Sequence, residues 1–283
     1  MGIDAAGLSG ELPFAGSDTR VTGHGRGRPA GIDRHQFQVA VSSQLQSYFR
    51  TSRFWVAFGV VVGLGALFSL VGSHQGLAPT ALGYVAGVTT LTAYLAIVTG
   101  ALFGGDAIST DFGSKTGYYM LPVPVRRSVL LGGRYLAAFL VSLLVMGTFY
   151  GIVSLGAIAF YPGGSVPWGN VALAYALVAV LMLGILSFAF ALSSMSKSSA
   201  FGLVLTIMML LVVFEILDAV VGGTVGPNYL WFSILYASNT VQSVVSAGLS
   251  ASGPGVGEAL VIMGAYAAGF LGLALVLFGR EEM

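Results

Sequence analysis

Six long apolar segments can be laid across a membrane so that all 12 Lys and Arg residues fall on one side of it. A helix needs about 20 mainly apolar residues to cross the hydrocarbon core of a bilayer. Cytoplasmic loops normally carry the excess of Lys and Arg, so this distribution predicts an even number of spans with both termini in the cytoplasm. We therefore expect an all-α membrane protein of six transmembrane helices, at residues 54–72, 80–104, 129–160, 170–192, 200–221 and 258–279.

The composition agrees with a multi-pass protein of the cell membrane. Of the 283 residues 56% are hydrophobic and only 8% are charged, whereas a soluble domain carries about 25% charged residues. A net charge of +1 gives no reason to expect a nucleic-acid partner. The absence of cysteine excludes thiol chemistry, and the three scattered histidines predict no metal site. Pairs of glycines four residues apart predict close helix contacts: Gly59 with Gly63, Gly83 with Gly87, Gly100 with Gly104, and Gly147 with Gly151.

The chain before the first span divides into two parts. Residues 1–33 are rich in glycine and lack the apolar core of a signal peptide, so they predict a flexible cytoplasmic tail or a basic tail touching anionic lipid. Residues 34–53 predict an amphipathic helix in the membrane interface, or else an extension of the first span. The transmembrane domain then covers 54–283. The helical spacing that supports the interfacial helix is that of Phe37, Val41, Leu45, Tyr48 and Phe49.

An interrupted apolar stretch lies between spans five and six, from Pro227 to Gly248. It is too short and too polar for another crossing, so it predicts short re-entrant or interfacial helices. Trp231 in this stretch is either part of an outer gate or an anchor in the membrane interface.

The most polar stretch after the tail is the segment 106–127, between spans two and three. Its sequence has recognisable ends, Ile108-Ser109-Thr110-Asp111 at the start and Pro124-Val125-Arg126-Arg127 at the finish, continued by Leu131-Gly132-Gly133-Arg134. In these motifs, and in their position between the second and third of six spans, the chain resembles the ABC-2 type permeases, which are membrane subunits of ABC transporters. The middle of the segment, Lys115–Tyr119, departs from the more acidic stretch of that family.

The resemblance implies that the segment 106–127 is a cytoplasmic coupling loop that docks on a separate ABC ATP-binding subunit. It also implies a second permease chain, identical or related, and transport out of the cell. Charged side chains would form the rim of the docking surface and aromatic side chains its anchors, although the arginines also fit a simpler role in topology and lipid contact. The expected coupling residues are Asp106, Asp111, Phe112, Lys115, Tyr118, Tyr119, Arg126 and Arg127.

The chain is not expected to hydrolyse ATP. Gly113-Ser114-Lys115-Thr116 resembles the end of a phosphate-binding loop, but that motif needs Gly directly before the Lys and another Gly five residues earlier. Here those positions hold Ser114 and Ser109. We therefore expect no cofactor in this chain, with ATP and Mg²⁺ bound by the partner subunit.

Two acidic residues, Glu215 and Asp218, lie one helical turn apart in span five. Ionisable groups inside a membrane segment are candidates for function. Glu215 lies about 22 Å along the span at 1.5 Å per residue, which is near the outer interface. The pair therefore predicts an outer gate, a cation path or only the headgroup boundary.

Two other classes of protein fit the same six spans. An ATP-independent secondary transporter would need charges near the midplane of the membrane, and Glu215 and Asp218 lie further out. A membrane scaffold without transport activity would have no ATP-binding partner for its coupling loop. The sequence does not identify the transported substrate.

Overall fold

The computed structural model describes residues 30–74, 80–105, 107, 127–164, 166, 168–196, 198–246 and 253–280, which form helices without a strand among them. Six helical stretches in these residues are long and apolar enough to cross a membrane. They confirm the predicted all-α fold and the number of spans. Their bounds are Ser52–Ser73, Ala81–Gly104, Ser128–Phe160, Trp168–Met195, Ala200–Thr224 and Val256–Leu277.

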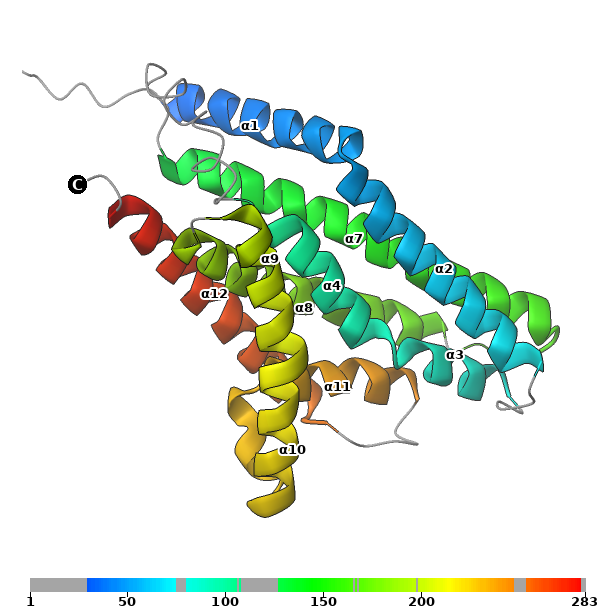
Figure 1. Cartoon of the computed structure of the whole chain (residues 1–283). Coiled ribbons are helices and arrows are strands. Elements are labelled where there is room, and N and C mark those ends of the chain that lie inside the picture. The colour runs from blue at the N-terminus through cyan, green and yellow to red at the C-terminus, as the bar shows by residue number, and fades with distance from the viewer. Residues whose placement is uncertain are drawn as a thin grey trace, which may run out of the picture.

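The spans are built from nine elements in chain order. Spans one to three are α2 (Ser52–His74), the pair α3 (Ala81–Thr89) and α4 (Thr92–Gly104), and α7 (Arg127–Phe160). Spans four to six are α8 (Trp168–Met195), then α9 (Ser199–Met208) with the π-helical turn η1 (Met209–Val213) and α10 (Phe214–Thr224), and finally α12 (Val256–Arg280). Figure 1 shows the start of α7, the start of α9 and the end of α12 at one end of the bundle, with α3, α10 and α11 (Ile234–Val245) toward the other.

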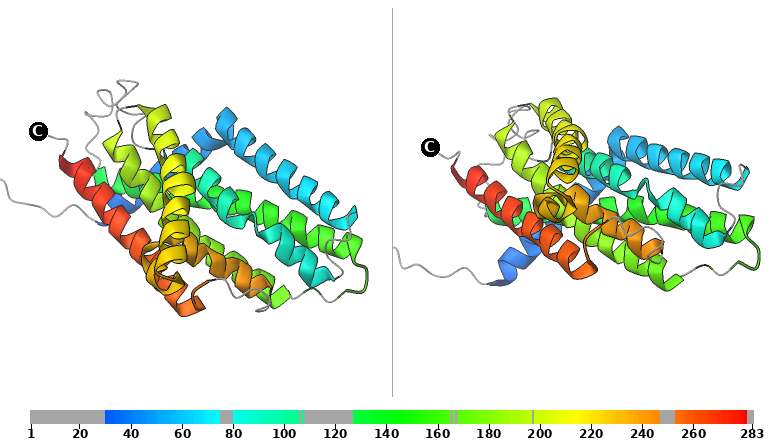
Figure 2. Two further views of the ribbon diagram at one scale, coloured as in Figure 1. Left: turned by 60° about the horizontal axis from the view of Figure 1, so that its bottom comes forward. Right: turned by 90° about the horizontal axis from the view of Figure 1, so that it is seen from below.

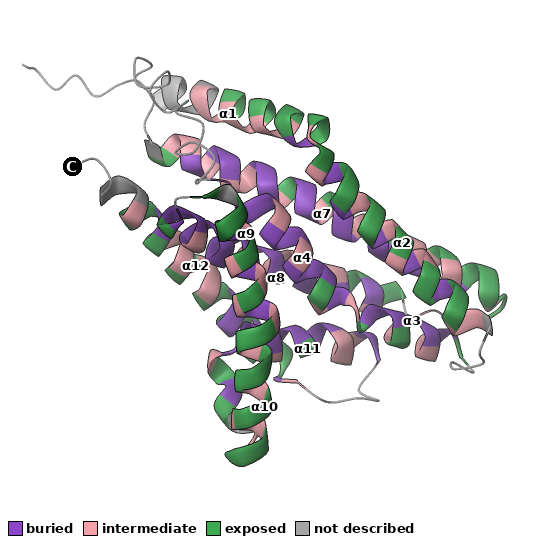
Figure 3. Ribbon diagram, in the orientation of Figure 1, coloured by how far each residue is buried: buried purple, intermediate pink, exposed green. Residues whose placement is uncertain are grey.

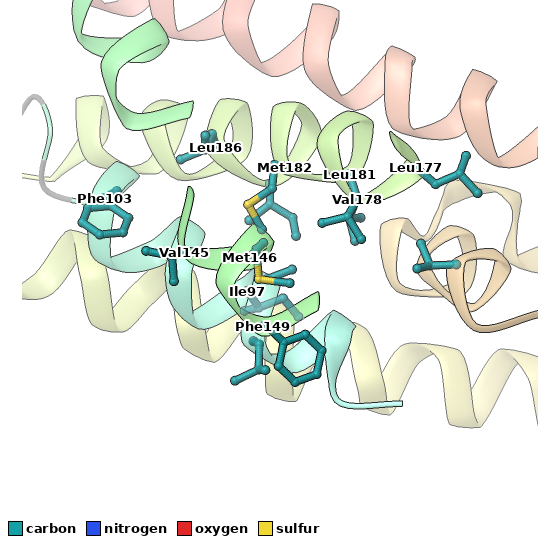
Figure 4. Packing of buried hydrophobic residues seen from close by; sticks show 14 of the residues in the cluster. Ile97, Phe103, Val145, Met146, Phe149, Leu177, Val178, Leu181, Met182 and Leu186 are labelled. Atoms are coloured by element: carbon teal, nitrogen blue, oxygen red, sulfur yellow. The ribbon is translucent and has the colours of Figure 1, made fainter. Parts of the chain in front are cut away.

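The centre of the bundle is α8, which packs against α4, α7, α9, α11 and α12. In the most apolar stretch of α8, 61% of the residues are buried, whereas the share is 17% in each of spans five and six. Figure 3 shows the same contrast, with buried residues along α4, α7 and α8 and exposed ones along α10. Side chains from α4, α7 and α8 fill the core between these helices (Figure 4), among them Ile97, Met146, Phe149, Leu181 and Met182.

Glycines allow α4 to approach α8 closely. A Cβ added at Gly100 would lie 2.5 Å from Cγ2 of Ile185, and one at Gly104 would lie 2.8 Å from Cβ of Ala189. This glycine pair therefore makes the close helix contact that its spacing predicts. Within the described residues of the chain the pair Gly59 and Gly63 makes no such contact, because a Cβ added at either position meets nothing within 4 Å.

We expect Gly104→Ala to lower the stability of the bundle. The Cβ of Ala189 cannot rotate away, so the two helices would have to separate at a cost of about 1–3 kcal/mol. The matched control is Gly151→Ala in α7, where an added Cβ has open space. Both changes gain the same helix propensity, about 1 kcal/mol. Thermal unfolding in detergent should show a lower Tm for Gly104→Ala alone, and equal Tm values would contradict the contact.

Span two is broken between α3 and α4 at Thr90 and Leu91. The Thr89 hydroxyl donates to the Val85 carbonyl at 2.8 Å, and the Thr90 hydroxyl donates to the Gly87 carbonyl at 2.7 Å. Such bonds from threonine back to the preceding turn compete with the helical ladder and bend helices. Both α3 and α4 contact α2, α7 and α11, and α4 packs in addition against α8 and α9.

The helix before the first span is α1 (Ala30–Arg50), which begins before the predicted residue 34 and ends at the bend formed by Thr51. Most of its predicted apolar face turns toward the protein. Val41 and Leu45 pack against the core, and Tyr48 is buried, whereas Phe49 is 42% exposed. This face therefore contacts α7 and the end of α4. The prediction of a helix in the membrane interface did not include these contacts with the protein.

Two short helices lie between spans five and six, as the sequence predicted: η2 (Pro227–Phe232), a 3-10 helix, and α11. The second, α11, packs against α3, α4, α8 and α12 and so closes one end of the bundle. Figure 2 shows that the α9–α10 rod runs in a different direction from α2, α7 and α12. No residue of α10 is buried, and apart from Phe214 at its start, which packs against the core, this second half of span five leaves the core.

Candidate functional site at the start of the 106–127 segment

The last residues of α4 lead into the 106–127 segment, and we call Phe103, Gly104, Gly105 and Ala107 the loop root. Each of these residues is at least 91% buried or lies against backbone of another helix. The 34-residue α7 begins on the other side of the segment. At 1.5 Å per residue α7 is about 51 Å long, so it extends well beyond an apolar layer of about 30 Å.

The loop root touches the start of span five backbone to backbone. A Cβ added at Gly202 of α9 would overlap the carbonyl oxygen of Gly105. In the other direction, a Cβ added at Gly105 would lie 2.8 Å from Cα of Leu203. Only two glycines permit this approach, because any side chain at either position would push the helices apart. Gly105 is thereby fixed against span five.

An arginine of span three also binds the loop root. Arg134 is only 9% exposed, and its Nη1 donates a 3.0 Å hydrogen bond to the carbonyl oxygen of Ala107. A hydrogen bond from a charged group to a buried carbonyl contributes about 1.5–3 kcal/mol. Arg134 is the last residue of the motif Leu131-Gly132-Gly133-Arg134. Its side chain makes a specific contact within the protein, in addition to any role of its charge in membrane topology.

A tyrosine from α1 completes the site. The Tyr48 hydroxyl donates to the Phe103 carbonyl at 2.9 Å, and the two rings meet edge to face with centroids 5.3 Å apart. Burial raises the pKa of Tyr48 to about 12, although a hydrogen bond to Gln44 and the positive charges of Arg134 and Arg53 act in the opposite direction. The hydroxyl therefore stays protonated, and remains a donor, throughout the neutral pH range.

The coupling residues expected from the sequence fall mainly outside the described residues. These are Asp106, Asp111, Phe112, Lys115, Tyr118, Tyr119 and Arg126, while Arg127 begins α7 but its side chain is not described. The structure thus describes both attachments of the segment, at Ala107 and at Arg127, and the coupling role of its residues stays a prediction.

The acidic residues of span five lie in different environments. Glu215 is exposed, whereas Asp218 is half-buried and its Oδ2 accepts a 2.8 Å hydrogen bond from the Ser233 hydroxyl. The second oxygen of Asp218, Oδ1, is buried and has no hydrogen-bond partner among the described residues. Trp231 lies on η2 with 66% of its surface exposed. The structure therefore brings Asp218 together with Ser233, a pairing that the sequence did not predict.

Ser233 links span five to the short helices. Its hydroxyl also accepts from the Tyr236 amide at 3.3 Å and so caps the N-terminus of α11. Nearby, the Tyr266 hydroxyl of α12 donates to the Phe232 carbonyl at 2.6 Å. A serine directly before a helical stretch is the one signal by which the sequence could have indicated Ser233 as a cap.

In the part of the chain that the structure describes, no three His, Asp or Glu side chains gather as metal ligands. The six long apolar helices among the described residues define a multi-pass integral membrane protein. The chain matches the family described as ABC-2 family transporter protein over residues 30–283, and it belongs to that family. A search of curated proteins finds no match.

Membership of this family confirms the resemblance seen in the sequence and makes the chain a transport component of the membrane that is not itself catalytic. Permeases of the family generally work with an ABC ATP-binding subunit.

Proposed function

We propose that this chain is the permease subunit of an ABC exporter and couples through the segment 106–127 to a separate ATP-binding subunit. ATP and Mg²⁺ bind to that partner, and a second permease chain completes the substrate path. The coupling surface consists of Asp106, Asp111, Phe112, Lys115, Tyr118, Tyr119, Arg126 and Arg127. Export is the direction that we propose from the family.

The observation that carries the proposal is the way in which the loop root contacts three spans at once. Gly104 lies against Ala189 of α8, Gly105 lies against Gly202 of α9, and Ala107 is bonded to Arg134 of α7. Packed interiors transmit displacement because they have few voids. A partner that moves the segment 106–127 would therefore move spans three, four and five together.

The first test is co-purification of this chain from native membranes in a mild detergent, with an ATPase assay on the eluate. We expect an ATP-binding subunit to co-purify and to show vanadate-sensitive ATP hydrolysis. Recovery of the chain alone, under conditions that preserve other membrane complexes, would contradict the proposal and favour a secondary transporter or a scaffold.

The double substitution Asp111→Lys with Phe112→Ala then tests the segment itself. It reverses one charge of the proposed surface and removes one aromatic anchor, and such anchors carry about 2 kcal/mol or more of an interface. We expect the permease to insert normally while its stimulation of the partner ATPase is lost. Unchanged stimulation would show that these two residues do not dock on the partner.

At the opposite end of the bundle, we propose that Asp218 and Ser233 form an outer gate, with Glu215 and Trp231 at its exposed rim. The Asp218–Ser233 hydrogen bond is a direct polar link between α10 and the η2–α11 pair. No residue of α10 is buried, and apart from the edge-to-face contacts of the Phe214 ring with Phe188 and Tyr266, α10 packs mainly against η2 and α11. The π-helical turn η1 lies between α10 and the packed α9, and such turns are frequent at functional sites.

We expect Asp218→Ala to open this end of the bundle. Loss of a charged hydrogen bond costs about 1.5–3 kcal/mol, so a cysteine introduced at the buried Leu235 of α11 should react with a water-soluble maleimide at least ten-fold faster. The chain has no cysteine of its own, so there is no background labelling. Glu215→Ala is the comparison at the exposed rim, where a smaller increase is expected because Glu215 is exposed. A labelling rate in Asp218→Ala equal to that of the wild type at Leu235→Cys would remove Asp218 from the gate.

A further inference from the structure

The helix α1 is held against α7 by contacts between small residues. A Cβ added at Gly133 of α7 would lie 2.9 Å from Cβ of Ala40 and 3.5 Å from the amide nitrogen of Val41. One added at Gly132 would lie 3.6 Å from the Phe37 ring. Helices that pack this closely cannot shift relative to each other without a steric clash. We therefore treat α1 and the first turns of α7 as one packed unit.

Tyr48 connects this unit to the end of span two. Because the last four carbonyls of a helix have no partner within it, the carbonyls at the end of α4 need donors from elsewhere. The Ala101 carbonyl accepts from the Gly105 amide, and the Gly104 carbonyl accepts from the Ala107 amide, so both donors belong to the loop root itself. The Phe103 carbonyl instead accepts from the Tyr48 hydroxyl, 55 residues away in the chain.

Among the described residues, two long-range donors reach the loop root, and both come from this packed unit. Tyr48 of α1 bonds to Phe103, and Arg134 of α7 bonds to Ala107, four residues further along. The start of the 106–127 segment is thus fixed to span three directly and through α1.

We propose that Tyr48 is a positioning residue for coupling, and that α1 with the first turns of α7 moves as one rigid unit with the loop root. In this arrangement α1 is part of the mechanical connection between the partner ATPase and the spans. The inference rests on the proposed function, because it assigns a role in the same coupling site.

The test is Tyr48→Phe in the complex with the co-purified ATP-binding subunit. This change keeps the ring contact with Phe103 and removes only the hydroxyl. We expect the stimulated kcat for ATP to fall about five-fold, equivalent to a net hydrogen bond of about 1 kcal/mol, with KM for ATP and the yield of complex unchanged. The matched control is Tyr94→Phe on α4, whose side chain is 48% exposed.

Two results separate this inference from the proposed function. If the wild-type chain fails to stimulate the ATPase, the proposed function fails. If the wild type stimulates and Tyr48→Phe stimulates equally, only the role of Tyr48 is overturned. A lower yield of complex with unchanged kcat per complex would also overturn it, because that is the effect of a residue that serves stability alone.

A distance measurement tests the rigid unit independently of any change at Tyr48. In the cysteine-free chain, Ser43→Cys on α1 and Ser128→Cys on α7 place spin labels at two exposed positions. We expect the same distance between the labels in the nucleotide-free and the vanadate-trapped complex. A resolved change in that distance would show that α1 moves relative to α7 and would overturn the rigid unit.

Discussion

Replacing Gly202 with alanine is expected to abolish stimulation of the partner ATPase and to lower the stability of the permease. The added Cβ would overlap the carbonyl oxygen of Gly105, and backbone cannot move aside as a flexible side chain can. The helices α4 and α9 would have to separate. We expect this to cost about 3 kcal/mol, the upper end of the range for overpacking. The loop root would then lose its contact with span five.

The experiment compares Gly202→Ala with Gly223→Ala, which lies further along the same span. Gly223 is also helical, and a Cβ added there meets nothing within 4 Å. Thermal unfolding in detergent and ATPase stimulation are measured for both variants. We expect both quantities to fall for Gly202→Ala and neither to fall for Gly223→Ala. A Gly202→Ala variant with wild-type Tm and stimulation would disprove the close contact.

Replacing Arg134 with glutamine is expected to have the second largest effect. It removes the charged donor of the Ala107 carbonyl, and leaving that buried group unpaired costs about 1–3 kcal/mol. We expect a roughly ten-fold or larger fall in ATPase stimulation, since 1.4 kcal/mol corresponds to a factor of ten. Arg134→Lys keeps the charge but lacks the planar fork of the guanidinium, so it should restore stimulation only in part.

The control for Arg134 is Arg50→Gln, at the exposed end of α1. Both arginines lie on the side that the charge distribution assigns to the cytoplasm, so both contribute to topology in the same way. If Arg134 acted only through topology, the two variants would behave alike. We expect Arg50→Gln to insert and to stimulate the ATPase as the wild type does.

The apolar face of α1 shows how far sequence periodicity reaches. The spacing of Phe37, Val41, Leu45 and Tyr48 predicts a helix with one apolar side, and the structure has that helix. Spacing does not say whether the apolar side meets lipid or protein, because both are apolar surroundings. The structure answers this for Tyr48, which is buried and bonded to Phe103.

Span five shows the same limit for polar groups. The sequence predicts that Glu215 and Asp218 share one region of a helix, and they do. It does not predict that Asp218 accepts a hydrogen bond from Ser233, because Ser233 lies 15 residues further along the chain, after the turn and η2. The π-helical turn η1 was not predicted either, since Met209–Val213 is a uniformly apolar run without a helix-breaking residue.

The sequence by itself determined the six spans and the family, because length, apolarity and charge are local properties that the bilayer selects segment by segment. Only the tertiary structure decided which groups meet at the loop root. Phe103 with Tyr48 and Ala107 with Arg134 are pairs separated by 55 and 27 residues. Glycine at 105 and at 202 has no meaning for function until packing brings the two backbones together. Such contacts depend on the positions of whole helices, and no local pattern in the chain records them.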